Sequence, residues 1–271
     1  MPPTSTSSSR TGRRHPSAGN LDARPALVRD GDQPVALTPA SFPHGAEPSR
    51  ELVQFGPDLD HEVLHKLVGP TDGRRILDLG CGAGAAAIAL ARRGARVIAV
   101  ESSTARLAQA RAAAEVAEVK VEFHHSDLAD LAFIRADSID SAFAVYSLAA
   151  VQDLGRVFRQ VHRILKPEAP FTVSLPHPVA CMLEFDDEQQ PPYLGRTAWS
   201  SSAITWRAGG DEGITHVHQI GDVFTTLTRS NFRVDALLEP RCEGAARGPH
   251  SSPLDDWVPS TLVVRARKLG I

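Results

Sequence analysis

The stretch ILDLGCGAGAAAIAL, residues 76–90, constrains the fold of this chain more than any other. An apolar run meets an acid, three glycines follow at alternate positions (Gly80, Gly82 and Gly84), and an alanine-rich segment comes next. Glycines between a parallel strand and a helix let backbone N–H groups approach a ligand at the helix N-terminus. The stretch alone fits a dinucleotide, a phosphate or a sulfonium cofactor, so its neighbours must decide.

Strand-like and helix-like segments alternate after this loop. Short runs rich in Val, Ile and Ala predict strands, and longer segments with a helical apolar stripe predict helices. Repeated β-α-β units with buried strands indicate an α/β protein with a doubly wound parallel sheet. The expected strands are 75–80, 95–101, 119–127, 138–147 and 170–176, and the expected helices are 83–93, 103–118 and 153–165.

The alternation is interrupted after the fifth strand. Residues 179–215 hold an aromatic-rich insertion without helical period, and residues 202–220 predict two strands around a glycine-rich turn. The pattern resumes with a helix at 222–230 and strands at 233–240 and 261–268. Residues 1–45 are rich in Ser, Pro and Arg and poor in apolar residues, so we expect a disordered extension before a domain at 46–271.

Composition excludes several classes of protein. The net charge of −3 and the lack of a basic stripe argue against a nucleic-acid partner. No apolar run is long enough to span a membrane, and no apolar segment follows the N-terminus as in a secretory signal. The three cysteines form no CxxC pair, so we expect neither a metal site nor a disulfide framework. These features predict a cytoplasmic protein.

Two cofactors remain compatible with the glycine loop at this point. Gly82, Gly84 and Ala87 satisfy the G-x-G-x-x-A pattern of dinucleotide sites, and Glu101 ends the second strand at the spacing of a ribose-binding acid. Asp78 inside the first strand and Asp127 at the end of the third strand distinguish the chain from that pattern. Asp127 could accept a hydrogen bond from an adenine amine.

This combination, with the turn RILKPEAPF before the fifth strand, resembles the class I S-adenosylmethionine-dependent methyltransferases, in particular their small-molecule, quinone-biosynthesis-like branch. The resemblance covers residues 52–268 and implies a Rossmann-like seven-stranded sheet whose last strand is antiparallel. It implies S-adenosylmethionine as cofactor, with the glycine loop against the methionine part, Glu101 on the ribose, Asp127 and Leu128 around the adenine and Tyr146 near the methyl donor. The cofactor-binding residues are then Asp78, Gly80, Cys81, Gly82, Gly84, Glu101, Ser102, Asp127, Leu128 and Tyr146.

Three departures from the family pattern stand out. The turn at residues 166–169 reads KPEA where the family often has KPGG. Asn231 replaces a glycine, and asparagine can adopt the left-handed conformation that the glycine would take. The segment YSLAAV after the fourth strand lacks the histidine often found there, so any histidine chemistry must come from elsewhere.

Methyl transfer is an in-line displacement that needs an aligned acceptor, exclusion of water and, for a hydroxyl or thiol, a base. We expect the base among His177, which follows the fifth strand, and His216 and His218, which would share one face of a strand. The insertion at 179–215 is expected to cap the pocket. Its aromatic residues are either substrate contacts or a local mini-core: Tyr193, Trp199 and Trp206.

The sequence thus predicts a methyltransferase, with S-adenosylmethionine as cofactor and a small molecule as acceptor, working as a monomer or homodimer. Two rival functions stay open. One is a non-catalytic protein of the same fold that binds S-adenosylmethionine or S-adenosylhomocysteine. The other is an NAD-dependent oxidoreductase, against which Asp127 and the absence of a second dinucleotide-binding half weigh.

Overall fold

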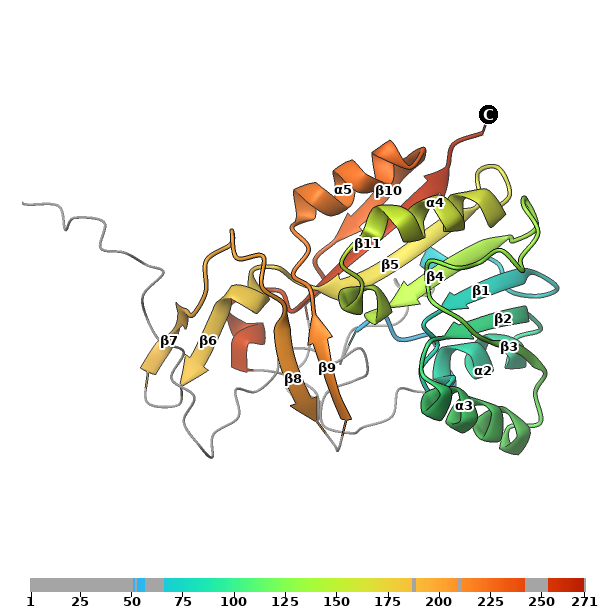
Figure 1. The fold of residues 1–271 in the computed structure, drawn as a ribbon, viewed down its shortest axis with the longest axis horizontal. Helices are drawn as coiled ribbons and strands as arrows, with labels where there is room; N and C mark the ends of the chain where they lie inside the picture. Colours follow the sequence, from blue (N-terminus) through green and yellow to red (C-terminus); the bar gives the residue numbers. More distant parts are fainter. Residues whose placement is uncertain are drawn as a thin grey trace, which may run out of the picture. The chain divides into compact units, whose positions relative to one another are not determined.

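A seven-stranded sheet forms the centre of the computed structural model, which describes residues 51, 53–56, 66–186, 189–208, 211–241 and 253–270. The strand order is β10-β11-β5-β4-β1-β2-β3, and every neighbouring pair is parallel except the two that involve β11 (Figure 1). The doubly wound sheet and its antiparallel last strand are therefore confirmed. The expected extension at 1–45 lies outside the described residues. The strands are β1 (Arg75–Leu79), β2 (Arg96–Glu101), β3 (Val121–His125), β4 (Ser141–Val145), β5 (Pro170–Pro176), β10 (Phe232–Leu238) and β11 (Thr261–Lys268).

Two of the helices begin at side chains that cap them. In α3 (Thr104–Val116) the Ser103 hydroxyl accepts the Arg106 N–H at 3.3 Å, and in α4 (Leu154–Ile164) the Asp153 carboxylate accepts the Arg156 N–H at 3.2 Å. Such caps satisfy backbone donors that the first helical turn leaves without partners. Two more α-helices are α2 (Ala85–Arg92) and α5 (Ile220–Arg229), and short 3-10 turns occur at η3 (Ser147–Ala150), η4 (Ala180–Met182) and η5 (Pro253–Asp256).

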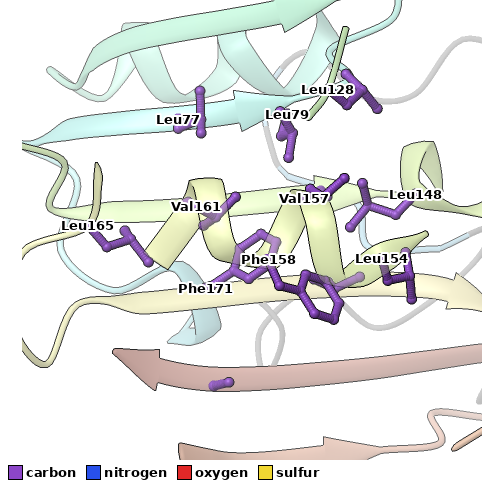
Figure 2. Packing of buried hydrophobic residues seen from close by; sticks show 14 of the residues in the cluster. Leu77, Leu79, Leu128, Leu148, Leu154, Val157, Phe158, Val161, Leu165 and Phe171 are labelled. Atoms are coloured by element: carbon purple, nitrogen blue, oxygen red, sulfur yellow. The ribbon is translucent and has the colours of Figure 1, made fainter. Parts of the chain in front are cut away.

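The larger core lies between the sheet and α4. Figure 2 shows the apolar stripe of this helix packed on β1, β4 and β5, with Val157, Phe158 and Val161 fully buried. The rings of Phe158 and Phe171 meet edge to face at 5.8 Å between centroids. Because a helix face and a sheet face are buried together, α4 fixes the positions of β4 and β5 and of the loops at their ends.

A second core covers the opposite face of the sheet. Ile76 and Phe143 from the sheet pack there with Leu90 of α2, and Phe55 from the segment before the sheet is fully buried against them. The rings of Phe55 and Phe143 lie 6.4 Å apart. Asp78 is paired with Phe143 in the register of β1 and β4, so its side chain belongs to this face.

The insertion after β5 forms two hairpins. One consists of β6 (Leu183–Asp186) and β7 (Gln189–Leu194), the other of β8 (Ile204–Ala208) and β9 (Asp211–Thr215). The second hairpin was expected from the glycine-rich turn, whereas the first was not, because Pro191 and Pro192 disfavour a strand. Since β9 ends at Thr215, the expectation that His216 and His218 lie on a strand is wrong: both are in the connection to α5.

No helix in the described part of the chain is both long enough and apolar enough to cross a bilayer.

Candidate functional site

The glycine loop joins β1 to α2 through three residues with positive φ. Gly80 and Cys81 donate their N–H groups to the Val100 carbonyl at 2.8 and 3.0 Å, which ties the loop to the end of β2. A Cβ on Gly80 would lie 2.1 Å from the Cβ of Ser147, so this position accepts only glycine. A Cβ on Gly82 would meet no atom of the described residues within 4 Å, although its φ of 55° also favours glycine. Gly80 therefore serves packing, while Gly82 faces open space.

Asp78 is buried directly beneath this loop and is only 2% exposed. Its Oδ2 atom has no hydrogen-bond partner among the residues that the structure describes. Burial and the nearby charge of Glu101 raise the pKa of Asp78 to about 8, although the Ala87 N–H lowers it. A buried polar atom without a partner is costly, so this carboxyl group is suited to receive a hydrogen-bond donor or a cation.

Glu101 ends β2 beside the loop. Its Oε2 accepts the Gly82 N–H at 2.9 Å and its Oε1 accepts the Ser103 N–H at 2.9 Å. These two bonds fix the carboxylate in one orientation while leaving each oxygen a second lone pair. A carboxylate held in this way can accept hydrogen bonds from the two hydroxyls of a ribose.

The ends of β2 and β3 form the next part of the site. The Asp127 Oδ1 accepts the Ala129 N–H at 2.7 Å within a turn, so this acid caps a turn rather than a helix. Leu128 is buried beside it. The His125 Nε2 lies 2.9 Å from the Ser102 carbonyl and links the two strand ends. Asp127, Leu128 and Ser102 therefore border one region at the carboxyl edge of the sheet.

Tyr146 follows β4 with φ 56° and ψ −14°, a left-handed conformation that is rare for a bulky residue. Its buried hydroxyl is hydrogen-bonded to the Thr261 hydroxyl on β11. Ser147 donates its hydroxyl to the Leu79 carbonyl at 2.5 Å and lies against Gly80. Strained backbone is concentrated at functional sites, and here it turns η3 toward the glycine loop.

The connection from β9 to α5 brings two histidines next to η3. The His216 N–H donates to the Ala149 carbonyl at 2.7 Å, and the His218 Nε2 lies 2.9 Å from the Val151 carbonyl. Burial lowers the pKa of His218, so its ring is neutral at pH 7 and donates from Nε2. The His216 ring has no hydrogen-bond partner in the described part of the chain, and its centroid lies 6.5 Å from that of His218.

His177 is held differently at the end of β5. Its Nδ1 accepts the Val179 N–H at 3.2 Å and its Nε2 lies 2.8 Å from Glu239, which fixes the Nε2–H tautomer. With both ring nitrogens engaged, His177 would have to break one of these bonds to take a proton from an acceptor.

Two of the three aromatic residues that the sequence analysis placed in the insertion are exposed. Tyr193 on β7 is 38% exposed and donates its hydroxyl to Glu184 at 3.0 Å, and Trp199 is 90% exposed. The side chain of Trp206 lies outside the described residues. A role in contacting substrate stays a prediction for all three.

The structure therefore brings the glycine loop, Asp78 and Glu101 together. The end of β3 lies beside Glu101, and Tyr146, at the end of β4, lies on the opposite side of β1. Ser147 was missed in the sequence analysis, because nothing in the segment YSLAAV indicates that this serine packs against Gly80. Cys81 lies in the glycine loop, and burial raises the pKa of its thiol far above the ordinary range. It is thus a small buried residue at pH 7.

The geometry fits S-adenosylmethionine. The orphaned carboxyl oxygen of Asp78 can receive the cationic amino group of its methionine part, and the open space at Gly82 admits a chain along the loop. The oriented Glu101 carboxylate matches a ribose diol, and the Asp127 region can border a purine.

Comparisons with known proteins agree with this geometry. Residues 76–168 match the model of a family described as "Methyltransferase domain". The chain is 33% identical over 193 residues to the methyltransferase phqN of Penicillium fellutanum, covering 70% of this chain and 55% of that protein. It is 34% identical over 102 residues to the ubiquinone biosynthesis O-methyltransferase of Hahella chejuensis, covering 38% and 43%.

A solved structure extends the similarity to the whole fold. An S-adenosylmethionine-dependent methyltransferase from Mesorhizobium loti superposes with a TM-score of 0.64 and 28% identity, over 76% of this chain and 96% of that one. The chain spans about half the length of the curated relatives it matches.

Proposed function

We infer that this chain, which belongs to the class I S-adenosylmethionine-dependent methyltransferases, transfers a methyl group from S-adenosylmethionine to a small-molecule acceptor. One observation carries the proposal: the orphaned Asp78 carboxyl, the open face of Gly82 and the oriented Glu101 carboxylate meet at the ends of β1 and β2. In open α/β sheets, ligands bind at this edge.

The bound cofactor supplies a methyl carbon made electrophilic by its sulfonium. We assign its methionine part to Asp78 and residues 80–84, its ribose to Glu101, and its adenine to Ser102, Asp127 and Leu128. Tyr146, with its hydroxyl bonded to Thr261, then limits how far the acceptor can approach from the end of β4. These side chains hold and orient the reactant, which is the chief contribution a protein makes to this reaction.

The acceptor side needs a base if the acceptor is a hydroxyl, as the names of the matched O-methyltransferases suggest. We propose His216 for this role, because its ring has no hydrogen-bond partner among the described residues and its backbone is tied to η3. His218, which donates to Val151, acts as a positioning residue for the same segment. We assign the two hairpins of 179–215 to a cap over the acceptor, as part of a domain at 46–271.

Calorimetric titration with S-adenosylmethionine, S-adenosylhomocysteine and NAD tests the cofactor. We expect micromolar binding of the first two and none of NAD. Asp127→Ala should weaken binding by about tenfold through loss of a charged hydrogen-bond acceptor. Asp130→Ala, which removes an exposed acid of the same turn, is the matched control. Binding of NAD alone would overturn the assignment in favour of an oxidoreductase.

A screen with methyl-labelled cofactor separates the enzyme from a non-catalytic binder. Labelled product should form with at least one small hydroxyl compound, and His216→Asn should lower kcat about 100-fold without changing the affinity for S-adenosylhomocysteine. His218→Asn should shift the pH profile of kcat less than His216→Asn does, and it should change the KM for the acceptor as well. Tight cofactor binding with no transfer to any acceptor would favour the binding protein instead.

A further inference from the structure

The loop between β7 and β8 contains a basic residue that has no role in the methyl transfer proposed above. Arg196 is half-buried, and its Nη2 donates to the Ser200 hydroxyl at 2.8 Å and to the Ser202 carbonyl at 2.5 Å. The Ser202 hydroxyl lies 3.2 Å from the same nitrogen, and the two serine hydroxyls are 2.8 Å apart. Within the described part of the chain, every hydrogen bond of this guanidinium is therefore made by Nη2.

The charge of Arg196 has no opposite partner in the described structure. No carboxylate of the described residues lies within ion-pair distance of it, whereas six other arginines and lysines form such pairs elsewhere. A guanidinium carries five N–H donors, so Nε and Nη1 keep donors to offer. The contacts to the two serines hold the side chain in one geometry, which lowers the entropy lost when an anion binds.

The position of this loop places the guanidinium on the acceptor side of the sheet. The Arg196 N–H donates to the Met182 carbonyl of η4, just after β5, and the Gln219 side-chain amide donates to the Ala198 carbonyl. Gln219 directly follows the segment that binds η3 through His216. The charge of Arg196 also reaches Cys181, whose pKa burial raises to about 12 and this charge lowers. Arg196 therefore lies between the C-terminal end of β5 and the segment that contains His216 and His218.

We propose that Arg196, Ser200 and Ser202 form an anion subsite of the acceptor pocket, and that the methyl acceptor carries a carboxylate or phosphate group. The inference rests on the proposed function, whose acceptor it defines. Arginine pairs with both oxyanions through parallel N–H···O bonds, and the serine hydroxyl that does not donate to its neighbour adds a further donor. The anion anchors the acceptor in the cap, while its nucleophilic group points to the end of β4.

Matched ligand pairs test this subsite on the protein saturated with S-adenosylhomocysteine. The pairs are 4-hydroxybenzoate with 4-hydroxybenzamide, and phenyl phosphate with phenol, each titrated calorimetrically. We expect the anion of at least one pair to bind about tenfold more tightly than its neutral partner, the effect of a charge-assisted hydrogen bond. The pair that shows the preference identifies the group as carboxylate or phosphate.

Three variants assign the preference to Arg196. Arg196→Gln should abolish it, Arg196→Lys should retain part of it, and Arg135→Gln, which removes an exposed arginine far along the chain, should leave it intact. All three should bind S-adenosylhomocysteine as the wild type does. Equal binding of anion and neutral partner in both pairs, or a preference that survives Arg196→Gln, would overturn the subsite. Failure of S-adenosylhomocysteine to bind the wild type would instead overturn the proposed function and the subsite with it.

Discussion

Replacing Asp78 by Asn should stabilise the protein in the absence of cofactor, in a manner that depends on pH. The pKa of Asp78 is raised to about 8 in the folded state by burial and by Glu101. In the unfolded chain this carboxyl group has its ordinary pKa of about 3.9. The folded state therefore binds the proton more tightly, so its stability is fully present below about pH 4 and is lost as the pH rises toward 8.

The magnitude follows from the difference between these pKa values. One pKa unit corresponds to about 1.4 kcal/mol, so the wild type loses about 4 kcal/mol by pH 7 and only about 1–2 kcal/mol by pH 5. Asn is neutral and of the same shape, so it escapes this loss. Urea unfolding at pH 5, 7 and 8.5 should show a stability difference between Asp78→Asn and wild type that widens with pH.

Asp72→Asn, which removes an exposed carboxylate from a turn, controls for the loss of one negative charge. A constant difference between Asp78→Asn and wild type across these pH values would refute the reasoning, since it would mean that Asp78 ionises alike in both states. Asp78→Asn should also bind S-adenosylhomocysteine more weakly than the wild type does, because the carboxylate that receives the amino group of the ligand is gone. Stability and binding would then change in opposite directions.

The structure also predicts the outcome of four further substitutions. Gly80→Ala should abolish S-adenosylhomocysteine binding and sharply lower the melting temperature, because the new Cβ would lie 2.1 Å from Ser147. Gly82→Ala should lower the free energy of unfolding by only about 1–2 kcal/mol, the cost of a left-handed backbone at alanine. Phe158→Ala should cost about 3–5 kcal/mol in urea unfolding as a fully buried ring, and an unchanged midpoint would contradict its place in the core. Glu168→Gly should raise the free energy of unfolding by up to about 1 kcal/mol, since Glu168 has φ 61°; a decrease would show that its ion pair with Arg233 matters more.

Two departures from the family pattern show how far local sequence reasoning reaches. Asn231 adopts φ 61°, as predicted for a residue that replaces a glycine. Glu168 adopts the same conformation at the KPEA turn, although nothing in its side chain favours it. Its carbonyl accepts a bond from Arg267 and its N–H donates to the Lys268 carbonyl, so β11 imposes this conformation from outside the turn.

The sequence by itself determined the sheet, because alternating strands and helices, capped by residues such as Ser103 and Asp153, form through local periodicity and short-range hydrogen bonds. It also determined the cofactor loop, since Asp78, the glycines and Glu101 lie at fixed spacings on adjacent β-α units. Tertiary structure alone decided the proposed acceptor side. Ser147 against Gly80 and His216 beside η3 are contacts between segments separated by tens of residues, and Arg196 near η4 is a contact across a hairpin. All three depend on packing that no periodicity encodes.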